Sequence, residues 1–321
     1  MTALRRFFRR HYEQWKSDTL TQSDFRPSVS ILLMSFMAIF IGIAGALVAW
    51  VLYRLIGLVT HIAFAGRIAF GFVEPALLHP PVWAIVAAPI VGGLLIGLMA
   101  RYGTDRIRGH GIPEALEAIL FRQSKMMVKV AILKPLSSGI AIGSGGPFGA
   151  EGPIIMTGGA IGSLIAQHFH LTGGERKSLL VAGAVAGMTA VFGTPVAAVL
   201  MAVELLLFEL RPRSLLPVAT ACAVAGFLRP LVIGSGALFP LQTAAVSPVA
   251  LASCLVAGLA CGALAWLMST ALYRVEDGFH RLPIHWMWWP ALGGLAVGIG
   301  GYFQPRALGV GYDVIGDLLH N

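Results

Sequence analysis

The sequence predicts an all-α polytopic membrane protein, and three observations favour this fold class. Of its 321 residues, 57% are hydrophobic and 12% are charged, and that charged share is about half the share in soluble domains. Residues 28–58 form an apolar run with no charged side chain before Arg54, and about 20 apolar residues are enough to cross a bilayer. Further long apolar segments are centred near residues 82–100, 177–192, 195–208, 214–235, 247–272 and 286–303. The chain is therefore expected to lie in a lipid bilayer.

The chain begins with a basic N-terminal segment, residues 1–27, which contains the run RRFFRR at positions 5–10. Basic residues beside membrane-spanning segments favour the cytoplasmic side, so we expect a cytoplasmic N-terminus. The formal net charge is +8, but the sequence shows no soluble basic face of the kind that binds nucleic acid. No nucleic-acid partner is expected.

The three cysteines lie within apolar runs, at Cys222, Cys254 and Cys261. Their spacing does not match a metal site, and their odd number argues against a disulfide framework. We expect buried, reduced thiols. No metal, no cofactor and no enzymatic activity are predicted.

Residues 101–125 are the most polar stretch after the N-terminus, and they predict a loop followed by a short helix that starts near Pro113. An apolar stretch follows at 126–143, where Pro135 is expected to break the helix. Another helix should open at Pro195. Short helices interrupted by glycine and proline are tolerated at membrane depth only where they are buried in protein or line a cavity, and in transporters they mark binding sites. Four glycines are instead predicted to serve only helix packing, namely Gly159, Gly162, Gly183 and Gly187.

Three loop-to-helix junctions share one design: GHGIPE at 109–114, GAEGPI at 149–154 and FGTPVA at 192–197. Each places glycine shortly before a proline that opens a helix, so the backbone can turn sharply into a helix N-terminus. Helix N-termini present free N–H groups and the positive end of the helix dipole. Several such ends that converge would bind an anion without a fixed cation. A nucleotide site is excluded, because the glycine-rich stretch has neither the GK[ST] of a P-loop nor the spacing G-x-G-x-x-G.

These junctions resemble the signatures of the CLC family of chloride channels and proton-coupled chloride transporters. GHGIPE is similar to the family's G-S-G-I-P-E, GAEGP to its G-R-E-G-P, and FGTP to its third motif, a phenylalanine followed by two small or polar residues and a proline. Lys134 lies seventeen residues before Glu151, the interval that the family keeps between its intramembrane lysine and its gating glutamate. The resemblance covers roughly residues 30–315.

The resemblance implies an inverted-repeat fold with short broken helices. The partners that it implies are a second copy of the chain, chloride or a similar small anion, protons and the lipid bilayer. It also implies a bacterial inner (plasma) membrane as the location. Carried over, the gate is Glu151, whose carboxylate would occupy the anion's site until protonation releases it. The remaining residues carried over to the anion path are His110, Gly111, Ile112, Lys134, Gly149 and Gly152.

The sequence departs from the family pattern at two positions beside the anion path. His110 replaces the serine that coordinates the anion, so the imidazole could donate a hydrogen bond to chloride or turn away and leave the backbone amides to bind it. Ala150 replaces the arginine before the gate, which removes a positive charge.

Proton coupling in the family uses a second glutamate in the helix after the third motif. Two alignments are open: one places Leu205, beside Glu204, at that position, and the other places Glu209 there. On one helix, Glu204 and Glu209 would point about 140° apart. A leucine at this position resembles channel-type members, so both an anion/proton exchanger and a proton-uncoupled, voltage- or pH-gated channel are predicted alternatives. A membrane-embedded enzyme is less favoured, because no nucleophile–base pair or cofactor motif is visible.

The expected domain organisation follows from the same motifs. Residues 28–235 are the predicted first transmembrane half with the anion-site and gate motifs, and residues 236–321 are the predicted start of an incomplete second half. The family's later G-x-F-x-P segment and its pore tyrosine have no counterpart before Asn321.

Overall fold

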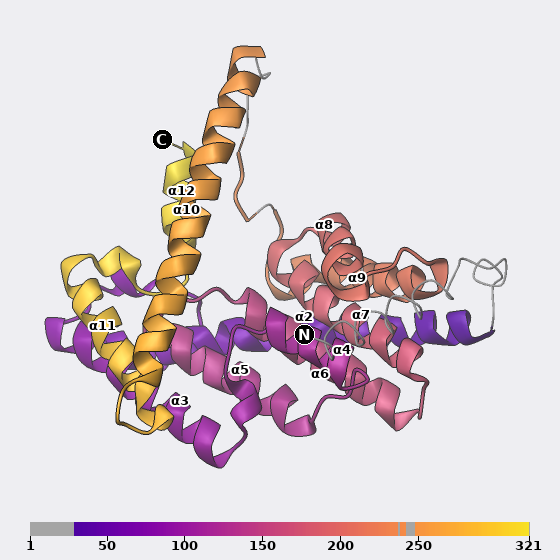
Figure 1. Cartoon of the computed structure of the whole chain (residues 1–321), viewed down its shortest axis with the longest axis horizontal. Coiled ribbons are helices and arrows are strands. Elements are labelled where there is room, and N and C mark those ends of the chain that lie inside the picture. The colour runs from indigo at the N-terminus through magenta and orange to yellow at the C-terminus, as the bar shows by residue number, and fades with distance from the viewer. Residues whose placement is uncertain (1–28, 237, 242–247, 321) are drawn as a thin grey trace, which may run out of the picture. The chain divides into compact units, whose positions relative to one another are not determined.

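The computed structural model describes residues 29–236, 238–241 and 248–320. The predicted basic segment, residues 1–27, lies outside the described residues. Within these ranges the regular structure is helical and contains no strand (Figure 1). The predicted all-α fold class is thus confirmed for the part of the chain that the structure describes.

The α-helices follow the predicted segments closely. They are α2 (Val29–Thr60), α3 (Val82–Tyr102), α4 (Ile112–Phe121), α5 (Val128–Gly143), α6 (Glu151–His168), α7 (Gly173–Phe192), α8 (Pro195–Met201), α9 (Pro212–Val232), α10 (Pro248–His280), α11 (Trp289–Phe303) and α12 (Tyr312–His320). Short 3-10 turns occur at Pro75–Leu78, Asp105–Ile107, Trp286–Trp288 and Pro305–Ala307, and π-helical turns at His61–Ala65 and Ala202–Leu207.

Four described helical segments are long and apolar enough to cross a membrane: Ile31–Ala65, Val82–Tyr102, Pro212–Val232 and Leu251–His280. The other three predicted segments do not reach this standard. The helix that opens at Pro195 reaches only Leu207, α11 has 15 residues and is about 22 Å long, and α7 begins with three charged residues at 175–177. The expectation of short, interrupted helices among full spans is confirmed.

The predicted helix break at Pro135 is wrong, because α5 runs through this residue from Val128 to Gly143. Proline removes one intrahelical hydrogen bond, but packing against neighbouring helices can compensate for that loss in membrane proteins. Local sequence signals do not contain this tertiary contribution.

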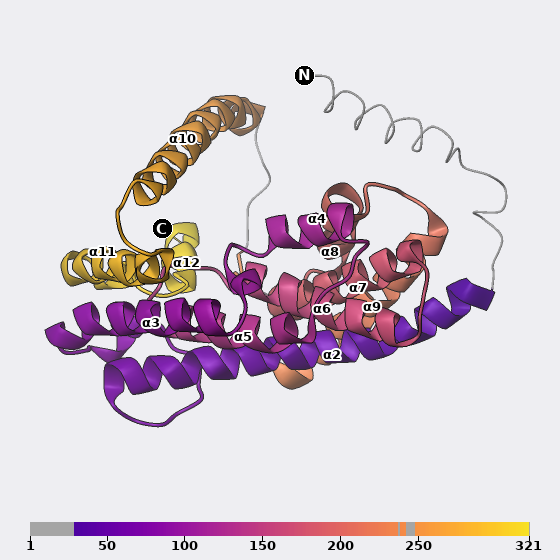
Figure 2. The same ribbon diagram turned by 60° about the horizontal axis from the view of Figure 1, so that its bottom comes forward.

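The described chain forms two compact units. The first contains residues up to 55, 104–138 and 149–236. In this unit α6 packs along α7, α7 packs on α9, and α4 lies on α6 (Figure 2). A Cβ on Gly162 would overlap the carbonyl of Leu179, and one on Gly183 would overlap the carbonyl of Gly158. The predicted packing role of Gly162 and Gly183 is therefore confirmed, since only glycine lets α6 and α7 approach this closely.

The second unit contains residues 56–103, 139–148 and those from 237 onward. Here α3 lies beside α11 (Figure 2), and their backbones meet at Gly93 and Gly294. The long apolar helix α10 belongs to the same unit, and none of its window Leu251–His280 is buried. This exposure is what a helix in contact with lipid shows.

A buried carboxylate caps the start of α12 within the second unit. Glu74 is 6% exposed, and its carboxylate lies near the backbone N–H groups of residues 310–312. Burial raises the pKa of the Glu74 carboxyl above its usual value, and the nearby Asp313 carboxylate raises it further. The connection before α3 is thereby joined to the end of the described chain.

Candidate functional site

The first two glycine–proline junctions meet in the structure. α4 begins at Ile112 and α6 at Glu151, as the motifs predict. A Cβ on Gly111 would overlap the backbone of Gly152, and a Cβ on Gly152 would overlap the carbonyl oxygen of His110. The two helix N-termini are thus in direct backbone contact, and only glycine fits at either position.

Gly111 also has a backbone angle that favours glycine. Its φ is +111°, in a region that residues with a Cβ rarely adopt. The turn into α4 and the approach to α6 therefore impose the same residue type at this position. The sequence motif indicated the turn, whereas the contact with α6 depends on the tertiary fold.

The predicted gate residue, Glu151, is the first residue of α6 and is half-buried. Its carboxylate folds back over Gly149 and occupies the space that a Cβ on Gly149 would need. Gly149 was predicted as an anion ligand, and the structure gives it a second use, which is to leave room for this carboxylate. A negative charge at this place interacts favourably with the positive end of the α6 dipole.

The predicted anion residue Lys134 is 3% exposed. Its Nζ donates hydrogen bonds to the carbonyl oxygens of Ile107, at 2.9 Å, and Gly109, at 2.8 Å. The ammonium group therefore holds the loop that leads into α4. This contact positions Gly111 against α6 and places a positive charge close to the paired N-termini.

Replacing Lys134 with methionine should lower the thermal unfolding midpoint of the protein in detergent. The substitution keeps most of the apolar stem but leaves two carbonyl groups without their donor, at a cost of about 1–3 kcal/mol per buried group. Lys129→Met is the matched control, because Lys129 is exposed on the same helix. Equal midpoints for Lys134→Met and Lys129→Met would contradict the assigned contact.

His110 and Ile112 flank Gly111 on the two sides of the turn. The His110 side chain is exposed, while its carbonyl oxygen faces Gly152. Ile112 is half-buried at the first position of α4.

Sequence reasoning missed Glu114, whose side chain contacts the backbone of the first junction. The backbone N–H of Gly111 donates to Glu114 Oε2 at 2.6 Å, and the carboxylate covers Gly109. The amide predicted to bind an anion is thus occupied by a side chain of α4. The signal was present, since a glutamate three residues after a helix cap is the spacing of a capping box.

The third junction opens α8 at Pro195 as predicted, and Pro195 lies against Gly226 of α9. The helical segment that begins here ends at Leu207, because Phe208 adopts a left-handed conformation with φ +55°. The predicted placement of Glu204 and Glu209 on one helix, about 140° apart, is therefore wrong. Phe208 lies between them and ends the helix, whereas the predicted angle assumes one continuous helix.

The two glutamates lie in different surroundings. Glu204 is exposed in the π-helical turn Ala202–Leu207. Glu209 is half-buried, accepts a hydrogen bond from Ser214 Oγ at 2.7 Å and lies 3.6 Å from Arg211 Nε. These contacts tie Glu209 to the start of α9.

Four candidate spans, short broken helices and two helix N-termini in backbone contact define an integral membrane protein of the broken-helix class. The chain belongs to the CLC family, since the sequence model of the voltage gated chloride channel family matches residues 92–321. This confirms the resemblance drawn from the three motifs.

Relatives and solved structures agree with this assignment. A putative chloride channel protein ClcB-like from Ralstonia nicotianae is 31% identical over 245 residues, which are 75% of this chain and 57% of the relative. The voltage-gated ClC-type chloride channel ClcB of Citrobacter koseri is 32% identical over 250 residues, 74% of this chain and 57% of the relative. The chain thus spans just over half the length of these relatives.

Two solved structures share the fold at low sequence identity. A slow cyanobacterial Cl⁻/H⁺ antiporter gives a TM-score of 0.73 at 22% identity, over 90% of this chain and 68% of that one. A CLC-type fluoride/proton antiporter gives 0.72 at 18% identity, over 90% and 70%. The predicted CLC-type fold is therefore confirmed.

Proposed function

We propose that this chain carries chloride or a similar small anion across a membrane, along a path that passes the paired N-termini of α4 and α6. The observation that carries the proposal is the backbone contact between Gly111 and Gly152. It sets two positive helix ends side by side, and helix N-termini bind anions through N–H groups and the helix dipole. Family membership and the names of the relatives support chloride as the anion.

In this proposal Glu151 is the gate. Its carboxylate lies at the N-terminus of α6, where an anion would otherwise be attracted. Protonation removes the charge that favours this position, so the side chain leaves and the anion enters. The lysine contact and His110 place further positive charge or a hydrogen-bond donor beside the same path.

The proposed protein is a homodimer in the bacterial inner membrane with a cytoplasmic N-terminus. Cytoplasmic connections carry an excess of lysine and arginine, and residues 101–125 contain five such residues besides the basic start of the chain: Arg101, Arg106, Arg108, Arg122 and Lys125. The two helical segments α2 and α3 separate these regions, so both lie on one side of the membrane if each helix crosses once.

A proton-uncoupled channel is the second candidate, and one observation favours it over an exchanger. Leu205 stands in one alignment of the proton position, and Glu209 of the other alignment is tied to Ser214 and Arg211. A carboxylate fixed by such contacts is poorly placed to pass a proton through the membrane.

Reconstitution of the purified chain in chloride-loaded liposomes tests the proposal. Chloride efflux is recorded with a chloride electrode after an ionophore has dissipated the membrane potential. We expect this efflux to exceed that of protein-free liposomes. Efflux equal to that of empty liposomes would reject anion transport. A pH electrode in the same vessel separates the candidates. Protons that move against their own gradient, driven by the chloride gradient, indicate an exchanger, and chloride movement alone indicates a channel.

A further inference from the structure

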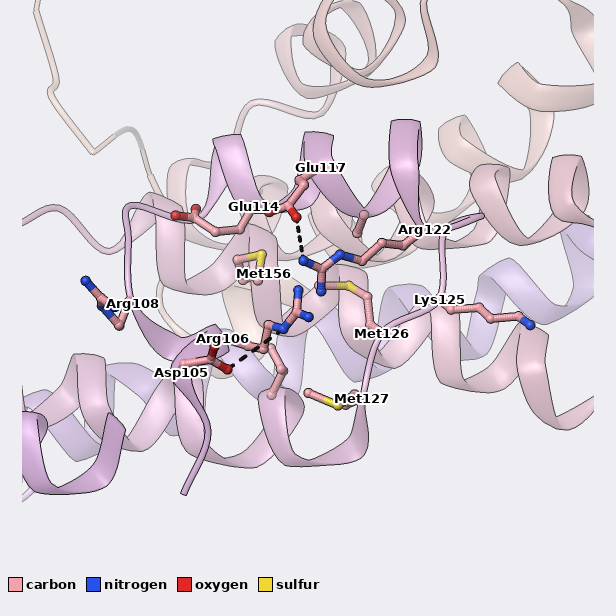
Figure 3. A pocket seen from close by; sticks show the side chains of 12 residues that line it. Asp105, Arg106, Arg108, Glu114, Glu117, Arg122, Lys125, Met126, Met127 and Met156 are labelled. Carbon is pink, nitrogen blue, oxygen red and sulfur yellow. Dashed lines mark hydrogen bonds and ion pairs between the residues drawn. The ribbon is translucent and has the colours of Figure 1, made fainter. Parts of the chain in front are cut away.

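A pocket of about 310 Å³ runs along α4 from Glu114 to Arg122 and reaches the start of α5 (Figure 3). It lies entirely within the first compact unit. Its lining combines charged side chains with methionines. The proposed anion path does not use these methionines. The lining of the pocket includes Arg106, Glu117, Arg122, Met126, Met127 and Met156.

Two arginine side chains point toward one another in this pocket. Arg106 comes from the turn Asp105–Ile107 and Arg122 from the end of α4 (Figure 3). Arg106 Nε is 3.9 Å from Asp105, beyond hydrogen-bond distance, and one terminal nitrogen of Arg122 pairs with Glu117. Each guanidinium has five N–H donors, so most donors of the pair are not used by these carboxylates.

The segment after Arg122 is held in a strained conformation. Gln123 and Ser124 have φ of +52° and +57°, which costs free energy for residues other than glycine. Ser163 Oγ donates to the Ser124 carbonyl at 2.6 Å and accepts from Met126 N at 3.1 Å, and Arg176 donates to the Gln123 carbonyl at 2.7 Å. Buried contacts from α6 and α7 thus fix the end of α4 from which the second guanidinium projects.

The apolar part of the pocket is formed by three methionines, Met126, Met127 and Met156. Met126 and Met127 directly precede α5, and Met127 is exposed. Val130 of α5 completes this part of the lining. A ligand that fits the arginines and the methionines together has a compact anionic group and an apolar tail.

We propose that the pocket binds the phosphate group of an anionic phospholipid between Arg106 and Arg122, with an acyl chain against Met126, Met127 and Met156. A phosphate oxygen pair matches the guanidinium fork and can accept from the guanidinium N–H groups that do not bond to Asp105 or Glu117. Residues 101–125 are the basic connection that we propose to lie on the cytoplasmic side, where anionic lipids give the membrane its negative surface potential. The site goes beyond anion transport and does not depend on it.

Native mass spectrometry of the purified full chain, titrated with phosphatidylglycerol or phosphatidylcholine, tests this proposal. We expect phosphatidylglycerol to bind more tightly than phosphatidylcholine. The double variant Arg106→Gln/Arg122→Gln should bind phosphatidylglycerol about tenfold or more weakly, since it loses charge-assisted hydrogen bonds. Arg108→Gln/Lys125→Gln is the control with the same loss of charge, because Arg108 and Lys125 also line the pocket but point away from its centre in Figure 3.

Three outcomes overturn the proposal. Equal losses in Arg108→Gln/Lys125→Gln and in Arg106→Gln/Arg122→Gln would indicate general attraction by basic residues. Arginine-dependent binding of inorganic phosphate, with no preference among lipids, would show a phosphate site whose ligand is not a lipid. Slower chloride efflux in Arg106→Gln/Arg122→Gln with unchanged lipid binding would assign the arginines to the anion path. Size-exclusion profiles show whether a variant that binds less lipid is misfolded. A second pair, Arg106→Lys/Arg122→Lys, keeps both charges but loses the guanidinium forks, and so separates the effect of the forks from the effect of charge.

Discussion

Glu151→Gln should raise chloride efflux at neutral pH and remove its dependence on pH. The glutamine keeps the size of the side chain but lacks the charge that holds it at the N-terminus of α6. A charge at a helix terminus is stabilised by about 0.3–2 kcal/mol, so efflux at pH 7 should rise about two- to thirtyfold, toward the level that the unmodified protein reaches in acid. Efflux from proteoliposomes measured between pH 4.5 and pH 8 gives both quantities.

Glu276→Gln serves as the control for this experiment. Glu276 is exposed on α10, so the same chemical change there should leave the flux and its pH profile unaltered. Glu151→Ala tests whether the side chain must be present at all. If Glu151→Gln and Glu151→Ala both keep the original flux and the original pH response, Glu151 is not the gate.

Gly152→Ala should reduce chloride efflux by at least about tenfold, the second large effect that we expect. The new Cβ would overlap the carbonyl of His110, so α4 and α6 would have to move apart. Such overpacking costs about 1–3 kcal/mol or more, and it acts where the two helix ends must converge. Efflux is measured as above, on protein that elutes as a single size-exclusion peak with an unchanged helical circular dichroism spectrum.

Gly174→Ala provides the comparison for Gly152→Ala. Gly174 lies in the first turn of α7 with open space where its Cβ would stand, and alanine is favoured over glycine in helices. This variant should transport chloride like the original protein. Normal efflux from well-folded Gly152→Ala would show that the contact between the two junctions is not needed for transport.

Local signals predicted the starts of the helices well. Proline at the first turn and glycine before it marked the beginnings of α4, α6 and α8, because these residues act through backbone angles that do not depend on distant neighbours. The membrane environment could also be predicted, since composition alone determines which segments are stable in lipid. The family motifs then identified Glu151, whose position at a helix start the structure agrees with.

The features that the sequence did not disclose depend on tertiary contacts. Pro135 lies within α5 instead of breaking it, Phe208 separates the two glutamates, and Glu209 is tied to the start of α9. The contact of Gly111 with Gly152 joins residues far apart in the chain, and no periodicity or propensity reports such a pairing. Glu114 is different, because its capping-box spacing could be recognised in the sequence. Only its hydrogen bond to the amide of the proposed anion site could not be predicted.

The hydrogen bond from the Gly111 amide to Glu114 has a consequence for affinity. In the proposed path, an anion that uses the Gly111 amide competes with the Glu114 carboxylate, which belongs to the same chain and is therefore always present at high local concentration. Its apparent dissociation constant is then the intrinsic constant divided by the fraction of time in which Glu114 has swung away. With a fraction of about one in ten, binding weakens about tenfold, and a weakly held ion is quickly released. The internal competitor thus favours turnover over retention.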